Sequence, residues 1–195
     1  WYSRDDEELI AEQMLDNGMD VMMGGGLRHW IPAACTDETS AAYLAVSNMI
    51  GGAFHFSSER EDDRDLIADA RAKGYQTVFT REGLEKAAGG KILGLFDSSG
   101  MPHAIAEARE MQSAERTCPT LREMTRTALD VLEDNPTGFF LMVEAGQIDW
   151  AGHNNDAGLL LHELLRLNGV LEEIRAFAAD DDDTLVILTA DHETG

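Results

Sequence analysis

Residues 184–195 read TLVILTADHETG, an apolar run that stops at an acid and a histidine. Such a short, continuous run of aliphatic and β-branched residues is typical of a strand buried on both faces. Residues 139–143, FFLMV, have the same character. Because helical patterns separate these runs, the sequence predicts an α/β fold of three layers, with a mostly parallel sheet covered by helices on both faces.

The rest of the chain alternates in the same way. Glycines and a threonine N-cap candidate, Thr120, mark helix ends, and apolar residues recur at helical spacing between them. The stretch at about 27–58 has mixed signals and is interpreted as an irregular insertion. Helices are expected within 4–18, 61–74, 81–90, 120–136 and 156–178, and strands within 19–26, 75–80, 91–97, 138–144 and 184–190.

Length and charge narrow the class of protein. The 195 residues fit one domain, or one domain with a small insertion, and no apolar run approaches the roughly 20 residues that cross a bilayer. The net charge is −22, from 37 acids against 15 bases, which disfavours nucleic acid and anionic membranes as partners. These acids either form a solubilising shell or, in part, bind cations, and only their spacing can separate the two interpretations.

Acids and histidines gather where two predicted strands end. Glu144, Asp149 and His153 follow the first, and Asp191 and His192 follow the second. The carboxyl ends of parallel strands meet at one sheet edge, where ligands bind. Asp149 and His153 are four residues apart, so one helical turn brings them to the same face. Carboxylate with imidazole suits zinc, whereas Glu144 better suits magnesium. Taken singly, each of these residues could instead be a cap, a turn residue or an ordinary polar side chain.

Other candidate sites are weaker. The glycines at 24–26 match no phosphate-binding fingerprint and favour a tight turn. The serines of FDSSGMP at 96–102 and of FHFSSER at 54–60 resemble no nucleophile elbow and are interpreted as loop serines. Cys35 and Cys118 fit no zinc spacing, and the sequence leaves open whether they are thiols or a disulfide.

At the acid and histidine positions the sequence resembles the alkaline phosphatase family. Residues 139–158, FFLMVEAGQIDWAGHNNDAG, and residues 184–195 are similar to that family's metal-binding block in type, order and spacing. Weaker similarity covers 20–32, 63–84 and 91–105. The resemblance implies a single, incomplete alkaline-phosphatase-like α/β domain over residues 1–195, with an irregular insertion at about 27–58.

The resemblance also implies ligands and chemistry. Glu144 matches a magnesium ligand, Asp149 and His153 match ligands of one zinc, and Asp191 and His192 match ligands of a second zinc. The family hydrolyses phosphate monoesters through a phosphoserine intermediate. No residue here matches the nucleophilic serine, so it is expected to lie outside this chain, no catalytic residue is assigned, and the chain alone is expected to be inactive.

Partners and location are also implied by the resemblance. It implies small phosphate monoesters as substrates, a homodimer, and a periplasmic or secreted protein, although the chain shows no signal peptide. Two alternatives stay open. One is another phosphate- or sulfate-ester hydrolase or mutase of the wider superfamily. The other is a non-catalytic metal-binding fragment.

Overall fold

The structure is a computed structural model that describes residues 3–111, 113, 116–180 and 183–194. It divides into two compact units, each described below by itself. The first unit is Trp1–Met101 with Thr117–Pro119, and the second unit is Pro102–Arg116 with Thr120–Gly195. The expectation of one domain over residues 1–195 stays a prediction.

A three-stranded parallel sheet forms the centre of the first unit. Its strands are β1 (Val21–Gly24), β2 (Tyr75–Val78) and β3 (Lys91–Leu95), in the order β1-β3-β2. β3 is hydrogen-bonded on both sides, and Leu93 is aligned with Met22 of β1 and Thr77 of β2. This confirms the predicted α/β class and its parallel sheet, and also the three strands expected in this half of the chain.

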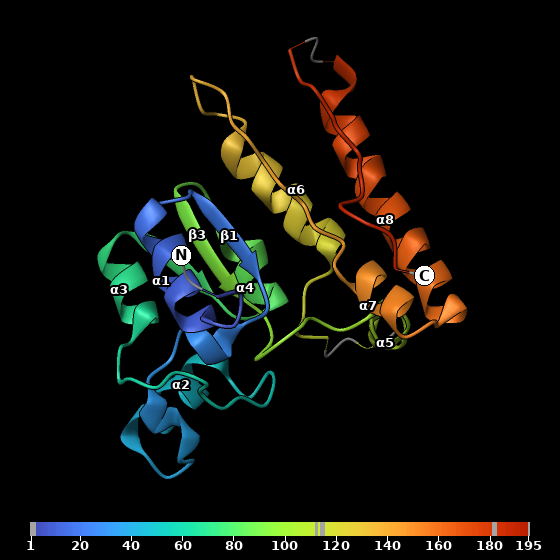
Figure 1. Ribbon diagram of the computed structural model, residues 1–195. Coiled ribbons are helices and arrows are strands. Elements are labelled where there is room, and N and C mark those ends of the chain that lie inside the picture. The colour runs from blue at the N-terminus through green and yellow to red at the C-terminus, as the bar shows by residue number, and fades with distance from the viewer. Residues whose placement is uncertain (1–2, 112, 114–115, 181–182, 195) are drawn as a thin grey trace. The chain divides into compact units, whose positions relative to one another are not determined.

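Helices cover both faces of this sheet, as a parallel sheet requires. Figure 1 shows the strands between α1 and α3 on one side and α4 on the other. The inward side chains of α1, α2 and α3 form one apolar core with side chains of the sheet, in which Leu15, Leu66 and Leu93 are buried. The helices of this unit are α1 (Glu7–Asn17), α2 (Ala41–Ile50), α3 (Leu66–Ala72) and α4 (Arg81–Lys86).

The stretch at 27–58 contains more regular structure than its mixed sequence pattern indicates. It holds two 3-10 turns, η1 (Leu27–His29) and η2 (Ala33–Thr36), followed by α2. The Ser40 hydroxyl caps α2 by accepting a hydrogen bond from the Tyr43 N–H at 3.0 Å. Val46 and Ile50 pack into the core of the first unit. A helix as short as α2 is marginal by itself, so this packing supplies most of its stability.

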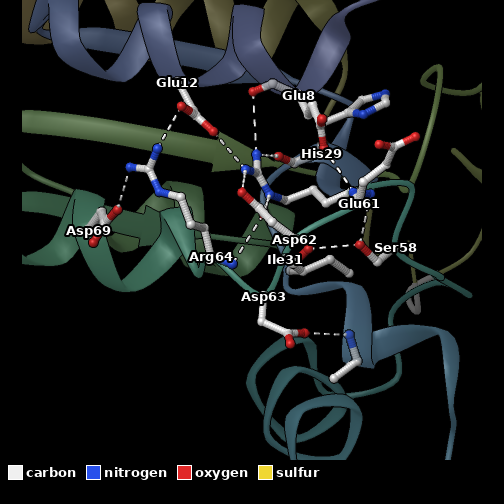
Figure 2. A network of polar contacts seen from close by, with 12 residues as sticks. Glu8, Glu12, His29, Ile31, Ser58, Glu61, Asp62, Asp63, Arg64 and Asp69 are labelled. Atoms are coloured by element: carbon white, nitrogen blue, oxygen red, sulfur yellow. Dashed lines mark hydrogen bonds and ion pairs between the residues drawn. The ribbon is translucent and has the colours of Figure 1, made fainter.

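Arg60 links α1, η1 and the loop before α3. Its side chain is fully buried, and its guanidinium donates to Glu12 Oε1 at 2.7 Å and Asp62 Oδ1 at 2.7 Å. It also donates to the backbone oxygens of Glu8 and His29. Figure 2 shows Glu8, Glu12, Asp62 and His29 around this network. A buried guanidinium needs this many acceptors, because an unpaired charge in a core is costly.

The second unit is helical in its described residues. α5, α6 and α7 each pack against the long helix α8. Thr120 caps α6 as expected, through a capping box in which its hydroxyl accepts from the Glu123 N–H and the Glu123 carboxylate accepts from the Thr120 N–H. The elements are α5 (Ala104–Glu110), α6 (Leu121–Leu132), α7 (Gln147–His153), α8 (Ala157–Phe177) and the turn η3 (Ala178–Asp180).

α5 was not expected from the sequence, which indicated a loop there. A buried acid from α8 explains it. The Glu163 side chain is 1% exposed, accepts a hydrogen bond from the Ala104 N–H at 2.6 Å, and pairs with Arg166 at 2.6 Å. Arg166 in turn reaches the Pro102 carbonyl and Glu107. The first turn of α5 is thus held by residues about 60 positions later, which local patterns cannot reveal.

The two apolar runs that were expected as strands, at 138–144 and 184–190, are not strands. The residues drawn as coil in Figure 1 include both runs. Phe140 is 90% exposed and Ile187 is 75% exposed. A strand exists only through hydrogen bonds to a neighbouring strand, and neither run has such a neighbour among the described residues. The prediction of two further buried strands is therefore wrong for this structure.

Two further sequence questions concern the cysteines and a membrane span. In the described residues Cys35 and Cys118 are not joined by a disulfide. Burial, together with Asp65 and Asp63 nearby, raises the pKa of the Cys35 thiol to about 11, so this thiol stays protonated. No helix in the described part of the chain is long and apolar enough to cross a membrane.

Candidate metal centre

The helix α7 positions two of the predicted ligands. Asp149 and His153 lie one helical turn apart, and Asp149 Oδ1 is 3.4 Å from His153 Nε2. The i,i+4 spacing that was read from the sequence therefore produces the expected neighbours. Both residues belong to the second unit.

The segment after residue 190 brings two more predicted ligands to α7. His192 Nε2 lies 3.7 Å from Asp149 Oδ1 and 3.3 Å from Asp191 Oδ2. The imidazole rings of His153 and His192 have their centroids 6.2 Å apart. Residues that are about 40 positions apart in the sequence thus converge on one carboxylate, that of Asp149.

This cluster contains a carboxylate oxygen without a hydrogen-bond donor and a histidine with a raised pKa. Asp149 Oδ1 is buried, yet it accepts no hydrogen bond in the described structure. The pKa of His192 lies above its usual value because the backbone carbonyl of Glu193 accepts from Nδ1 at 3.0 Å, with Asp191 and Asp149 adding negative charge. A buried carboxylate oxygen without a donor is costly, and a cation would satisfy it.

Glu144 lies at the start of the same helix. A Cβ atom added to Gly146 would stand 3.3 Å from Glu144 Oε1, so this carboxylate lies beside the first turn of α7. The Glu144 side chain is exposed, and in the described residues it makes no ion pair with His153 or His192. The structure therefore brings four of the five predicted ligands together and leaves Glu144 at the edge of the cluster.

The donor set fits a divalent metal in kind. Carboxylate and neutral imidazole are zinc ligands, and an additional carboxylate suits magnesium. The orphaned Asp149 oxygen is the structural observation that favours a cation here. No three His, Cys, Asp or Glu side chains within the described ranges are already arranged around a common point at metal-ligand distance. Binding of a metal would therefore require these side chains to move closer together.

The glycine loop at 24–26 is a tight turn and not a phosphate cradle. The N–H groups of Gly26, Leu27 and Arg28 donate to the carbonyls of Ser99, Asp97 and Ser98, at 2.8, 3.1 and 3.2 Å. A Cβ on Gly25 would stand 1.9 Å from Ser99 O, so glycine is required where the two loops meet. Because these N–H groups already have partners, they are not offered to a phosphate.

One of the rejected serines has a structural role. The Ser58 hydroxyl is buried, donates to the Ile31 carbonyl at 2.8 Å, and accepts from the Arg60 N–H at 3.1 Å. Ser58 thus belongs to the Arg60 network of the first unit (Figure 2). This agrees with its interpretation as a loop serine.

Sequence reasoning missed one close contact at the candidate metal centre. Gly152 of α7 and Thr194 pack so closely that a Cβ on Gly152 would stand 1.8 Å from Thr194 Oγ1. The only available signal was a small residue between two ligands in DWAGH, which indicates nothing about a distant contact.

Comparison with known proteins identifies a family. The family model for alkaline phosphatase matches residues 3–195. Alkaline phosphatase 3 of Bacillus subtilis is 38% identical over 159 residues, covering 82% of this chain and 32% of that protein. The repressible alkaline phosphatase of Saccharomyces cerevisiae is 33% identical over 208 residues, covering 97% of this chain and 33% of that protein.

Solved structures agree. The Thermus thermophilus alkaline phosphatase matches with a TM-score of 0.79 and 36% identity, covering 99% of this chain and 35% of that chain. A mutant of the TAB5 alkaline phosphatase with Mg bound matches with a TM-score of 0.69 and 27% identity, covering 97% of this chain and 45% of that chain. This chain spans about a third of the length of the curated relatives given above. It belongs to the alkaline phosphatase family.

Proposed function

We propose that this chain supplies metal ligands to a phosphate monoester hydrolase that works with two zinc ions, one magnesium ion and a phosphoserine intermediate. Asp149 and His153 would hold one zinc, Asp191 and His192 the second, and Glu144 the magnesium. The observation that carries the proposal is the convergence of both imidazoles on the Asp149 carboxylate, whose Oδ1 lies 3.4 Å from His153 and 3.7 Å from His192.

The roles of the residues follow from their chemistry. The carboxylates of Asp149 and Asp191 supply negative charge that neutralises a divalent cation, while the imidazoles bind through nitrogen in their neutral form. Divalent cations held about 3.5–4 Å apart stabilise the entering and leaving oxygens of a phosphoryl displacement. The helix α7 holds the backbones of Asp149 and His153 in register, so both side chains leave the same face of one helix.

Zinc binding tests the assignment. We expect isothermal titration calorimetry of the 195-residue chain to show zinc binding that weakens at least tenfold, by the loss of one of few ligands, in Asp191→Ala and in His153→Ala. His162→Ala is the matched control, because His162 is exposed on α8 and belongs to no ligand set. Equal zinc affinity in all of these proteins would contradict the assignment.

The missing nucleophile gives a separate expectation. No serine of this chain matches the family's nucleophile, so the chain alone should hydrolyse p-nitrophenyl phosphate no faster than a buffer control with the same zinc and magnesium. Robust turnover by the pure chain would show that the serine assignment is wrong. Small phosphate monoesters as substrates, a homodimer, the absence of nucleic acid partners, and a periplasmic or secreted location stay predictions.

A further inference from the structure

The contact between Gly152 and Thr194 lies inside the candidate metal centre. Gly152 precedes His153 directly, and Thr194 follows His192 by two residues. A Cβ on Gly152 would stand 1.8 Å from Thr194 Oγ1, 2.9 Å from Thr194 Cβ and 3.4 Å from Thr194 O. Ordinary carbon contacts begin near 3.5 Å, so the two residues can meet at this distance only because residue 152 has no side chain.

This contact joins α7 to a C-terminal segment that has no regular secondary structure at residues 184–190. Residues 184–192 form no strand, and the apolar side chains at 185–188 are exposed. Such a segment has many available conformations, and fixing it costs roughly 1–2 kcal/mol for each residue. Thr194 itself is half-buried against α7. A close packing contact of the C-terminal segment is therefore two residues from a predicted ligand.

We propose that Gly152 and Thr194 are positioning residues for the metal centre. Their close packing holds the Asp191-His192 segment against α7, so that the two ligand pairs, one from each segment, face the same space. A side chain at position 152 would push Thr194 away and carry His192 with it. This inference rests on the proposed function, because it assumes that the two pairs bind metal.

The shift of Thr194 that a side chain at position 152 would cause is large enough to weaken zinc binding. Rotation of the Thr194 side chain could turn Oγ1 away, but Thr194 Cβ would still stand 2.9 Å from the new Cβ, so residue 194 itself must shift by about half an ångström to reach an ordinary carbon contact. Metal–ligand distances tolerate only about 0.2 Å. Residue 152 touches no metal in this scheme, so its effect would act entirely through the position of the second ligand pair.

The test compares four variants of the 195-residue chain. Gly152→Ala should weaken zinc binding at least tenfold by calorimetry. The double variant Gly152→Ala/Thr194→Gly, which removes both Oγ1 and Cβ of residue 194, should recover to within threefold of Thr194→Gly alone. Gly169→Ala is the matched control, because it makes the same change in a helix where the nearest atom to the new Cβ, Arg122 Cδ, is 3.7 Å away. It should bind zinc like the unmodified chain.

A spectroscopic readout separates positioning from general damage. With Co²⁺ in place of zinc, Gly152→Ala should lose intensity in the visible absorption bands that report low coordination number, and the double variant should regain it. The helical circular dichroism should be the same in all four variants. Affinity in Gly152→Ala within threefold of the unmodified chain, or no recovery in the double variant, would overturn the proposal.

A failure of the proposed function would look different. In that case the unmodified chain would bind no zinc, or His153→Ala would bind it equally well. The packing would then be judged by proton NMR, through the nuclear Overhauser contact between the Thr194 methyl group and the Gly152 α-protons. Its absence in the unmodified chain, or an unchanged His192 ring resonance in Gly152→Ala, would refute the positioning role independently of any metal.

Discussion

Two apolar stretches of similar composition differ in burial: one is a buried strand, and the other is exposed and forms no strand. In β3, residues 91–95, Leu93 is 1% exposed and is hydrogen-bonded between β1 and β2. In residues 184–190, Leu185 is 82% exposed and pairs with no strand among the described residues. The residue types alone would have favoured burial of both. The difference teaches that an apolar run predicts a tendency to extend, while burial depends on a partner strand and a covering helix.

The largest expected effect compares these two stretches directly. Leu93→Ala should lower the free energy of unfolding by about 3 kcal/mol, because it opens a cavity in a packed core. Leu185→Ala should change it by no more than about 0.5 kcal/mol, as for other exposed positions. Urea denaturation followed by circular dichroism measures both. A cost for Leu185→Ala approaching that of Leu93→Ala would mean that residues 184–190 are buried in solution.

Buried and exposed charged side chains of the first unit should likewise differ in their contribution to stability. Arg60→Met removes a buried guanidinium and leaves the acceptors Glu12 and Asp62 without it, so we expect a loss of about 2 kcal/mol. Lys86→Met removes an exposed ion pair with Glu82, and its effect should stay below about 0.5 kcal/mol. The measurement is the same denaturation series. Equal effects of the two substitutions would contradict the buried network of Figure 2.

In the second unit, the contribution of a partly buried ion pair to stability can be measured by changing the pH. Burial acts to raise the pKa of Glu123, but hydrogen bonds from Arg116 and from the Thr120 N–H outweigh it and bring the pKa to about 2. The folded state therefore binds fewer protons than the unfolded state, and this stabilisation is complete above about pH 4.5 and lost as the pH falls toward 2. After allowance for solvent screening we expect about 1 kcal/mol.

Thermal melting between pH 6 and pH 2.5 would measure this contribution. Glu123→Gln should remove it, so that the variant and the unmodified chain converge in stability at low pH. Glu110→Gln, at the end of α5, is a suitable control because Glu110 is exposed. If the stability difference between Glu123→Gln and the unmodified chain were the same at both ends of the range, the ion pair would not be responsible.

The smallest expected change in stability tests the other exposed run. Phe140 is 90% exposed, so Phe140→Ser should alter the free energy of unfolding by less than about 0.5 kcal/mol. It should nevertheless raise the concentration at which the chain begins to aggregate, because exposed apolar residues promote association. Light scattering at increasing protein concentration checks this. Phe96→Ser, in the core at 1% exposure, should instead unfold the first unit.

Local interactions made part of the fold predictable. The capping box at Thr120 and Glu123, and the i,i+4 pair Asp149 and His153, depend on residues within one helical turn. The strands β1, β2 and β3 were found because each is followed or preceded by glycine and helical patterns. α5 was missed because its first turn is held by Glu163, a residue far along the chain.

The sequence by itself determined the places of most helices, the chemical identity of the candidate metal ligands, and the motifs that resemble the family. These depend on neighbours in the chain and on the kinds of atoms present. Only the tertiary structure decided which apolar runs are buried, that His192 lies near the Asp149 carboxylate, and that Thr194 packs on Gly152. The reason is physical: burial and convergence require partners from distant parts of the chain, and local patterns contain no information about where those partners lie.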